Sequence, residues 1–362
     1  MVLRRRAIAM AMAAAVASVG LSSRSFAPKV LAQKKDEKKQ DEQQKKEVQN
    51  IVKLADEAAS GQSAQNDLAL AWVREDVLKA QGNKEYVPFV VTIDPSKVSG
   101  GTLAFYWRVV SKDGTSAPPP DNSSGKKDEK KDKDAKGKPE YAYEDVSFIP
   151  MTPGQNGQTR IARSFTVPSG SYDVYIIAKE PTSSQKGAPP PKVSVLKQTV
   201  AVPDFWNGEL NTSSVIIAQR IDPLPAPLTP QQQADRPYAL GQMEILPQLD
   251  MMFSKKQELQ TFMLIYNPKT NSVNKPDVMV EYNFYAKQSG AEKFFNKTNP
   301  QNLNAETLPP NFDVAAGHQL QSGQAVPLAS FPEGDYRLEI KITDKVANKT
   351  LTRDVNFTVT AS

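Results

Sequence analysis

The chain of 362 residues contains no cysteine and a single histidine, His318. Without cysteine it cannot form disulfides, thiolate metal sites, iron–sulfur centres or a thiol nucleophile. One histidine is too few for a histidine-based metal cluster. His318 lies in an Ala-Gly-His-Gln stretch, and the chain has no Gly-x-Ser-x-Gly nucleophile motif. We therefore predict a protein that is not an enzyme and has no catalytic, cofactor-binding or metal-binding residues.

A hydrophobic run long enough to span a bilayer as a helix is also missing. The longest run, residues 7–21, has about 15 residues, whereas a spanning helix needs roughly 20. It follows three arginines and precedes small residues at 30–32, an order typical of a secretory signal peptide cleaved before Gln33. We predict a signal peptide at 1–32 and a periplasmic or secreted mature chain that does not span the membrane. Retention of the signal as an anchor stays open, as does export by the Sec or the twin-arginine route.

An excess of positive charge is missing once the signal peptide is removed. The chain has 45 Lys and Arg against 40 Asp and Glu. Residues 1–32 hold five of the basic residues and no acid, which leaves 40 of each in the mature chain. The basic runs at 34–47 and 126–138 are interspersed with acids. A nucleic-acid-binding domain would cluster its Lys and Arg, so we exclude nucleic acid as a partner.

What the sequence does contain is a pattern that occurs twice. A Pro-x-Gly-x-Tyr element followed by alternating apolar residues lies at 168–176 and again at 332–340. Two strand-like segments precede it in each half in the same order. The matched segments are 89–95 with 262–268, each ending in an Asx-Pro turn, and 106–110 with 282–286. This order predicts two tandem copies of one module.

The alternation of apolar residues points to β-sandwiches. Period two places every second side chain on one face of a sheet. Trp107 lies mid-strand, where immunoglobulin-type sandwiches bury a tryptophan. Tyr172 and Tyr336 share parity with the apolar residues that follow them, which predicts a tyrosine corner in each copy. We predict an all-β fold of two tandem immunoglobulin-like β-sandwiches, preceded by the signal and a short helix.

The predicted organisation has five parts. They are a signal peptide (1–32), a charged spacer with a short helix (33–65), a first sandwich (66–203), a strand with a Pro-rich extended linker (204–237) and a second sandwich (238–362). Residues 112–140 of the first sandwich contain no large apolar side chain, so we predict a disordered insertion between two strands there.

The short helix is predicted from apolar residues at helical spacing. They are Val48, Ile51, Val52, Ala55 and Ala59. Gly61 is suited to end the helix, because glycine tolerates a left-handed conformation at a helix C-terminus. The apolar stripe is narrow, and we expect it to pack on the first sandwich and not on a membrane.

Part of the chain resembles a known type of module. The residues concerned are Leu246, Pro247, Phe253, Tyr266, Asn267, Tyr282, Phe284 and 331–338. Through them, residues 240–359 resemble a secreted, immunoglobulin-like β-sandwich module of acidobacterial exported proteins, found there beside GWxTD-type or von Willebrand A-related modules. Residues 203–205, Leu210 and 213–214 resemble the strand that precedes it. The resemblance implies a fold and no activity, since the chain has neither a GWxTD stretch nor a metal-adhesion site.

Duplicated β modules more often bind or brace than catalyse. We expect a non-enzymatic protein–protein interaction or scaffold protein whose partner is another envelope or secreted protein. The alternative is a carbohydrate-binding accessory protein of the cell envelope, because aromatic residues that could bind polysaccharide gather in or near the second module. They are Trp206, Tyr282, Tyr285, Phe294 and Phe295. A third possibility is a chaperone-like pair of sandwiches that pairs through its edge strands.

Overall fold

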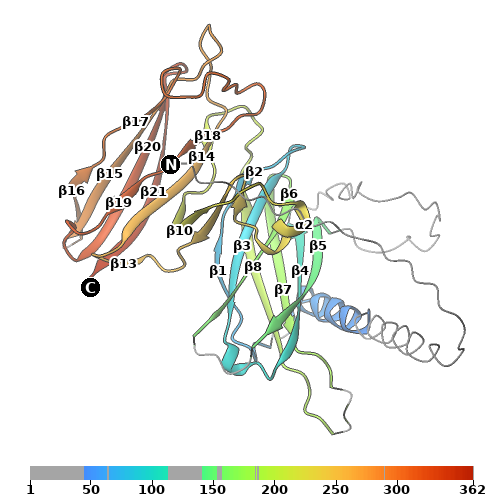
Figure 1. Ribbon diagram of the computed structural model, residues 1–362. Coiled ribbons are helices and arrows are strands. Elements are labelled where there is room, and N and C mark those ends of the chain that lie inside the picture. The colour runs from blue at the N-terminus through green and yellow to red at the C-terminus, as the bar shows by residue number, and fades with distance from the viewer. Residues whose placement is uncertain are drawn as a thin grey trace, which may run out of the picture. The chain divides into compact units, whose positions relative to one another are not determined.

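The computed structural model describes most of the chain outside its N-terminus. The described residues are 45–62, 65–112, 141–152, 157–183, 185, 187–288 and 290–361. The predicted signal peptide, residues 33–44 of the charged spacer and nearly all of the predicted insertion lie outside them. From Glu47 onwards the chain forms one compact unit. Its strands build two sandwiches (Figure 1), which confirms the predicted all-β, immunoglobulin-like fold class.

The first sandwich consists of two antiparallel sheets. In one sheet β3 lies at the centre and pairs with β1, β2 and β6; the other has the order β5-β4-β7-β8. The strands are β1 (Ala71–Glu75), β2 (Leu78–Lys79), β3 (Glu85–Ile93), β4 (Gly101–Ser111), β5 (Tyr143–Met151), β6 (Thr159–Val167), β7 (Gly170–Lys179) and β8 (Val193–Val202). Trp107 of β4 is buried between the sheets, as predicted, and its indole N–H donates to the Ser164 carbonyl at 3.1 Å.

The second sandwich repeats this arrangement. In one sheet β14 is central and pairs with β9, β10, β18 and β19. The other sheet has the order β13-β21-β20-β15-β16. The strands are β9 (Asn211–Thr212), β10 (Ile216–Pro223), β11 (Ala239–Leu240), β12 (Met243–Pro247), β13 (Met252–Ser254), β14 (Glu258–Tyr266), β15 (Val278–Gln288), β16 (Ala291–Lys297), β17 (Gln301–Leu303), β18 (Leu320–Ser322), β19 (Ala325–Pro327), β20 (Gly334–Asp344) and β21 (Lys349–Thr360). In the second sandwich β15, β20 and β21 pair as β4, β7 and β8 do in the first.

Both Pro-x-Gly-x-Tyr elements form tyrosine corners. The Tyr172 hydroxyl donates to the Pro168 carbonyl at 2.9 Å, and the Tyr336 hydroxyl donates to the Pro332 carbonyl at 2.8 Å. Both rings are buried. Gly170 and Gly334 have φ values of 153° and 144°, a region that side-chain-bearing residues rarely adopt. The repeated motif thus fixes the same turn at the start of β7 and of β20.

The sequence match between the second strands of the two modules was wrong by one residue. It set Tyr106 against Tyr282. In the ladders, Trp107 lies opposite Ile176 and Tyr282 lies opposite Ile340, both four residues after the corner tyrosine, so Trp107 and Tyr282 are the equivalent residues. Tyr106 belongs to a cluster on the outer face of its sheet, whereas Tyr282 lies in the second core. A shift of one residue in a strand exchanges its two faces.

The predicted helix extends over the described residues up to 59 and packs on the outer face of the β4–β7–β8 layer. Ile51 and Ala55 are fully buried against Tyr106, Ile177 and Val193. Ala59, which we predicted in the stripe, is exposed, and Leu54 and Ala58 contact the sheet instead.

The helix ends at Gly61 as predicted. Gly61 has φ 82°, and the Gly61 and Gln62 N–H groups donate to the carbonyls of Ala58 and Glu57. This is the Schellman pattern, in which two otherwise unpaired carbonyls of the last turn are satisfied.

Two ion pairs accompany the apolar contacts of the helix. Lys179 of β7 donates to Glu47 at 2.5 Å, and Arg108 of β4 donates to Asp56 at 2.5 Å. Arg108 is only 1% exposed. Its guanidinium also lies 3.8 Å from the ring centroid of Tyr141. The buried charges of the sheet face are therefore neutralised by acids of the helix, which makes the helix a component of the first sandwich.

The segment 204–237 is less of a linker than its composition predicts. β9 and β10 pair with β14 of the second sandwich. Part of the Pro-rich stretch, predicted to be extended, forms the short helix α2 (Pro230–Asp235). Thr229 and Gln232 form a capping box around Pro230, which occupies the first helical position. These local capping bonds override the extended preference of the Pro-rich composition.

The two sandwiches share part of their cores. Phe262, Leu264 and Tyr266 of β14 join the hydrophobic cluster of the first sandwich, while Met263 and Ile265 of the same strand face the second core. β14 is therefore apolar on both faces because it is covered on both. Within the compact unit that begins at Glu47, this one strand contributes to both cores.

A buried polar network crosses this junction. Arg74 forms a bidentate pair with Asp76, with N–O distances of 2.6 and 2.7 Å, and also donates to the Val215 carbonyl at 3.1 Å. The Tyr238 hydroxyl donates to Asp76 at 2.8 Å. Burial alone would lower the pKa of Arg74, but the hydrogen bonds and charge of Asp76 raise it. Both charged groups therefore have hydrogen-bond partners besides each other, which offsets the cost of removing a buried ion pair from water.

Candidate functional site

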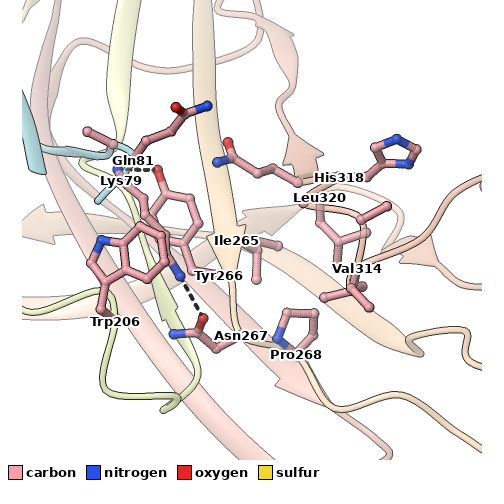
Figure 2. A pocket seen from close by; sticks show the side chains of 15 residues that line it. Lys79, Gln81, Trp206, Ile265, Tyr266, Asn267, Pro268, Val314, His318 and Leu320 are labelled. Atoms are coloured by element: carbon pink, nitrogen blue, oxygen red, sulfur yellow. Dashed lines mark hydrogen bonds between the residues drawn. The ribbon is translucent and has the colours of Figure 1, made fainter. Parts of the chain in front are cut away.

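Two adjoining hollows lie where the two sandwiches meet. One has a volume of about 490 Å³ and is lined by residues of β2, the 204–208 turn, the end of β14 and the loop 314–320. A neighbouring hollow of about 500 Å³ shares Lys79, Ala80, Gly317 and Gln319 with the first. We call the two together the junction groove. Figure 2 shows Trp206, Lys79 and Asn267 on one side of the first hollow, with Val314 and His318 on the other.

Trp206 is the aromatic group of this groove. Its side chain is 40% exposed. Its backbone N–H donates to the Asp204 carboxylate at 2.7 Å, and its indole N–H donates to the Lys84 carbonyl at 3.2 Å. The Lys79 ammonium lies 4.2 Å from the ring centroid, a cation–π distance. The ring is thus held in place while remaining open to solvent.

Asn267 links Lys79 to the second sandwich. Its side-chain oxygen accepts from the Lys79 ammonium at 3.1 Å, and its side-chain N–H₂ donates to the carbonyls of Phe205 and Glu209 at 3.0 and 2.9 Å. Asn267 has φ 56°, a left-handed conformation that asparagine tolerates better than most residues. The Asx-Pro turn noticed in the sequence therefore orients an amide towards the groove.

His318 contributes a second basic group. Its Nδ1 accepts from the Asp313 backbone N–H at 3.1 Å, and its own backbone N–H donates to the Asp313 carbonyl at 3.1 Å. In the neutral ring the proton then resides on Nε2, which becomes a donor. The side chain lines the groove, and its described hydrogen-bond partners include no carboxylate or hydroxyl nucleophile.

The described residues that line the groove are basic or uncharged, and none of them is an acid. Among these lining residues, Lys79 and His318 are the only ionisable side chains besides tyrosines. Burial lowers the pKa of Lys79, and the charges of Glu85 and Asp204 offset part of that effect. Glu85 lies opposite Lys79 in the β2–β3 ladder and is 1% exposed. Burial also raises the pKa of Glu85, which favours its neutral form.

Side-chain amides supply most of the remaining polar lining. They are Gln81, Gln233, Asn267, Gln319 and Gln321. Sequence reasoning missed these residues, since they come from four separate segments whose spacing in the chain gives no sign that they meet.

The aromatic residues grouped in the sequence analysis do not form one site. Tyr282 is fully buried and its hydroxyl is bonded to Ser322 at 2.8 Å. Phe295 packs against the second core. Phe294 is 52% exposed and its ring meets Tyr285 edge-on, on the sheet that carries β15 and β16. Of the five, Trp206 alone lines the junction groove.

A second candidate site is the edge of β8. At its start, Val195 N–H donates to the Gln65 carbonyl and Asp67 N–H donates to the Val193 carbonyl. The backbone N–H and C=O groups of alternate residues point to the same side of a strand. Because those of Val193 and Val195 point away from β7, the N–H and C=O groups of Lys197, Thr199 and Ala201 do so as well. All three residues are exposed, and β8 pairs with no other strand among the described residues.

The corresponding edge of β21 is better protected. β13 covers its last residues in parallel pairing, from Thr358 to Thr360. Arg353 points inward from β21 and donates to Thr212 and Asn211. An inward charge discourages pairing at an edge strand. The ladders place Leu196 of β8 at the position of Arg353, so the first sandwich lacks this protection.

The described residues contain neither a cluster of metal-ligating side chains nor a membrane-spanning helix. Within the described ranges, no group of three or more His, Asp and Glu side chains could hold a metal ion. The helices of the described part of the chain are too short or too polar to cross a membrane.

Comparison with known proteins places the chain in no family. No family model matches it, and no curated protein matches it. Among solved structures it is similar to Salmonella alpha-2-macroglobulin reacted with methylamine, with 12% identity over 81% of this chain and a TM-score of 0.20. Trypsin-activated alpha-2-macroglobulin from Escherichia coli gives 11% identity over 83% of this chain and a TM-score of 0.20. The chain spans 17% of the length of each. A likeness this low carries no information about function.

Proposed function

We propose that the chain is an exported, non-enzymatic protein that binds an extended segment of another envelope or secreted protein along the edge of β8. The observation that carries this proposal is the row of outward backbone groups at Lys197, Thr199 and Ala201, which pair with no other strand among the described residues. Of these groups, the Thr199 carbonyl accepts from the side-chain N–H₂ of Gln198 at 3.2 Å. Addition of a strand to an exposed sheet edge is a recurrent mode of peptide recognition. Main-chain hydrogen bonds supply its affinity.

The rest of the unit suits a scaffold. The shared core and the Arg74–Asp76 pair hold the two sandwiches together, and the N-terminal helix covers the outer face beside β8. A partner strand would meet a strand already ordered by its pairing with β7, so little ordering entropy would be lost on the side of this protein.

Photo-crosslinking at the two edges tests the proposal. A photoreactive residue is placed at Thr199 and, as a matched control, at Thr352 of β21, and the protein is expressed in its own cells. We expect an adduct with another exported protein from Thr199 and none from Thr352. An adduct with a second copy of this chain, or the same adducts from both positions, contradicts the proposal.

Proline variants supply the second arm of the test. Ala201→Pro removes an outward N–H and no bond to β7, so the fold should tolerate it. It should lower the yield of the Thr199 adduct, whereas Thr352→Pro, the same change on β21, should not. Thermal unfolding of both variants checks that the fold is retained.

Carbohydrate binding is a second candidate function. The specific observation in its favour is the fixed, solvent-open ring of Trp206 in a groove rich in side-chain amides. Polysaccharide pull-down with the wild type and with Trp206→Ala, using Phe294→Ala as the control for an exposed aromatic outside the groove, tests this candidate separately from the β8 edge.

A further inference from the structure

We propose that the junction groove binds an oligosaccharide that carries uronic-acid carboxylates. The inference rests on the carbohydrate-binding candidate and names its ligand class. It concerns a surface distinct from the β8 edge, so the two proposals can fail independently.

The charge of the groove favours an anion. Lys79 forms no ion pair with any described carboxylate, and its ammonium has a single described hydrogen-bond acceptor, Asn267. An ammonium has three donors, so donors remain for a ligand carboxylate. No acid is among the described residues that line the groove. The nearest acids, Glu85 and Asp204, lie behind the lining. Burial lowers the pKa of Lys79, and the charges of these two acids raise it and so favour its charged form.

The Trp206 ring and the amides favour a sugar over a simple carboxylate. Trp206 offers an amphipathic surface whose orientation is fixed by its bonds to Asp204 and Lys84. Each of the lining amides is both a donor and an acceptor, which matches the hydroxyl groups of a sugar. The basic groups lie at the two sides of the first hollow, with Lys79 beside Trp206 and His318 across from them (Figure 2).

The extent of the groove favours a chain of several sugar units. The two hollows adjoin along Lys79, Ala80, Gly317 and Gln319, and both are open to the surface. The second hollow adds Gln233 and Gln321 as polar groups, together with the apolar side chains of Leu240 and Phe262. A ligand that reached from Trp206 to Gln321 would contact both sandwiches at once.

Calorimetric titration with matched oligosaccharides tests the inference. The probes are oligogalacturonate, a neutral gluco-oligosaccharide of the same length, and oligoglutamate as an acidic peptide. We expect oligogalacturonate to bind more tightly than the neutral sugar, with an affinity that falls as salt is added, because salt screens the carboxylate–ammonium attraction.

Two variants locate the binding. Lys79→Met should weaken oligogalacturonate binding roughly tenfold or more, in line with the loss of a charge-assisted hydrogen bond, and weaken neutral-sugar binding by a clearly smaller factor. Trp206→Ala should weaken both. The matched controls are Lys293→Met and Phe294→Ala, which alter an exposed cation and an exposed aromatic on β16 outside the groove. Neither control should change binding.

Each contrary outcome has a distinct meaning. Equal binding of acidic and neutral sugars, unaffected by Lys79→Met, overturns the acidic-ligand inference and leaves the carbohydrate candidate standing. Binding of oligoglutamate with the same dependence on Lys79 and Trp206 assigns the groove to an acidic peptide and overturns the inference. Absence of binding by any sugar overturns the inference and the carbohydrate candidate together.

Discussion

The hydroxyl groups of Tyr172 and Tyr336 make the same corner hydrogen bond in the two sandwiches, so the effect of losing each bond on stability can be measured separately. Tyr172→Phe and Tyr336→Phe each keep the ring and remove the bond to the proline carbonyl. We expect each change to lower the free energy of unfolding by about 1–2 kcal/mol, the cost of a lost buried hydrogen bond with an unpaired acceptor. Denaturant unfolding of both variants measures it. A loss at one corner and none at the other would show that the two corners are not equivalent.

Residue spacing alone could predict these corners but not the junction pair. Arg74 and Asp76 are two residues apart, as are Arg220 and Asp222, and in both pairs the Arg Nε lies 2.6 Å from the Asp Oδ2. The first pair has side chains 11% and 2% exposed, the second 65% and 43%. The sequence pattern is the same, and only the packing of the second sandwich over Arg74 separates a structural ion pair from a surface one.

At the scale of the element, the N-terminal helix is attached through a pH-sensitive contact. Burial alone would raise the pKa of Glu47, but hydrogen bonds from Lys179 and Thr182 and the charge of Lys179 lower it below its ordinary value of 4.5. The ionised form therefore favours the folded state. Its contribution is fully present above pH 4.5 and is lost as the pH falls through the lowered folded-state pKa.

We predict that Glu47→Gln destabilises the protein at neutral pH and that the difference from the wild type shrinks in acid. Measuring the free energy of unfolding of both proteins from neutral pH to below 4.5 tests this. The matched control is Glu57→Gln, which alters the exposed Lys53–Glu57 pair of the same helix, 3.8 Å apart, and should have little effect. A Glu47→Gln difference that stays constant with pH would contradict the prediction.

The existence of the strands could be predicted more securely than their equivalence between the two modules. Apolar alternation revealed β4 and β15, but Tyr106 and Tyr282 were paired because they are chemically alike. The ladder registers pair Trp107 with Tyr282. Tyr106 lies on the outer sheet face that the N-terminal helix covers, and no helix covers the equivalent face among the described residues of the second sandwich. The chemical likeness of the two tyrosines therefore led to the wrong pairing.

At the scale of the whole molecule, the shared core predicts that the two sandwiches unfold together. Asp76→Asn leaves the buried Arg74 without its counter-charge, and we expect a loss of roughly 3–5 kcal/mol. We also expect the single unfolding transition of the wild type to separate into two. Asp222→Asn, in the exposed pair of the same geometry, should cost about 1 kcal/mol or less and leave one transition. Calorimetry of the three proteins tests this, and two transitions in the wild type would contradict it.

The sequence analysis treated the sandwiches as separate bodies because nothing in the sequence of β14 indicates that it packs against the first sandwich as well as the second. The run from Phe262 to Tyr266 is apolar at every position, which is also typical of a strand buried inside one domain. Only the structure shows that Phe262, Leu264 and Tyr266 belong to the first core and Met263 and Ile265 to the second. The junction groove could not be foreseen for the same reason, since it exists only where the two bodies meet.

The shared core has a consequence for avidity. The β8 edge and the junction groove are carried by one compact unit, and β14 contributes to the cores of both sandwiches between them. If both are occupied by parts of one envelope assembly, binding at the first site presents the second at a high effective concentration, provided that the spacing of the targets matches. A spacing that does not match receives no such gain, since the packed core constrains the distance between the two sites. The protein would then select the geometry of its surroundings as well as their chemistry.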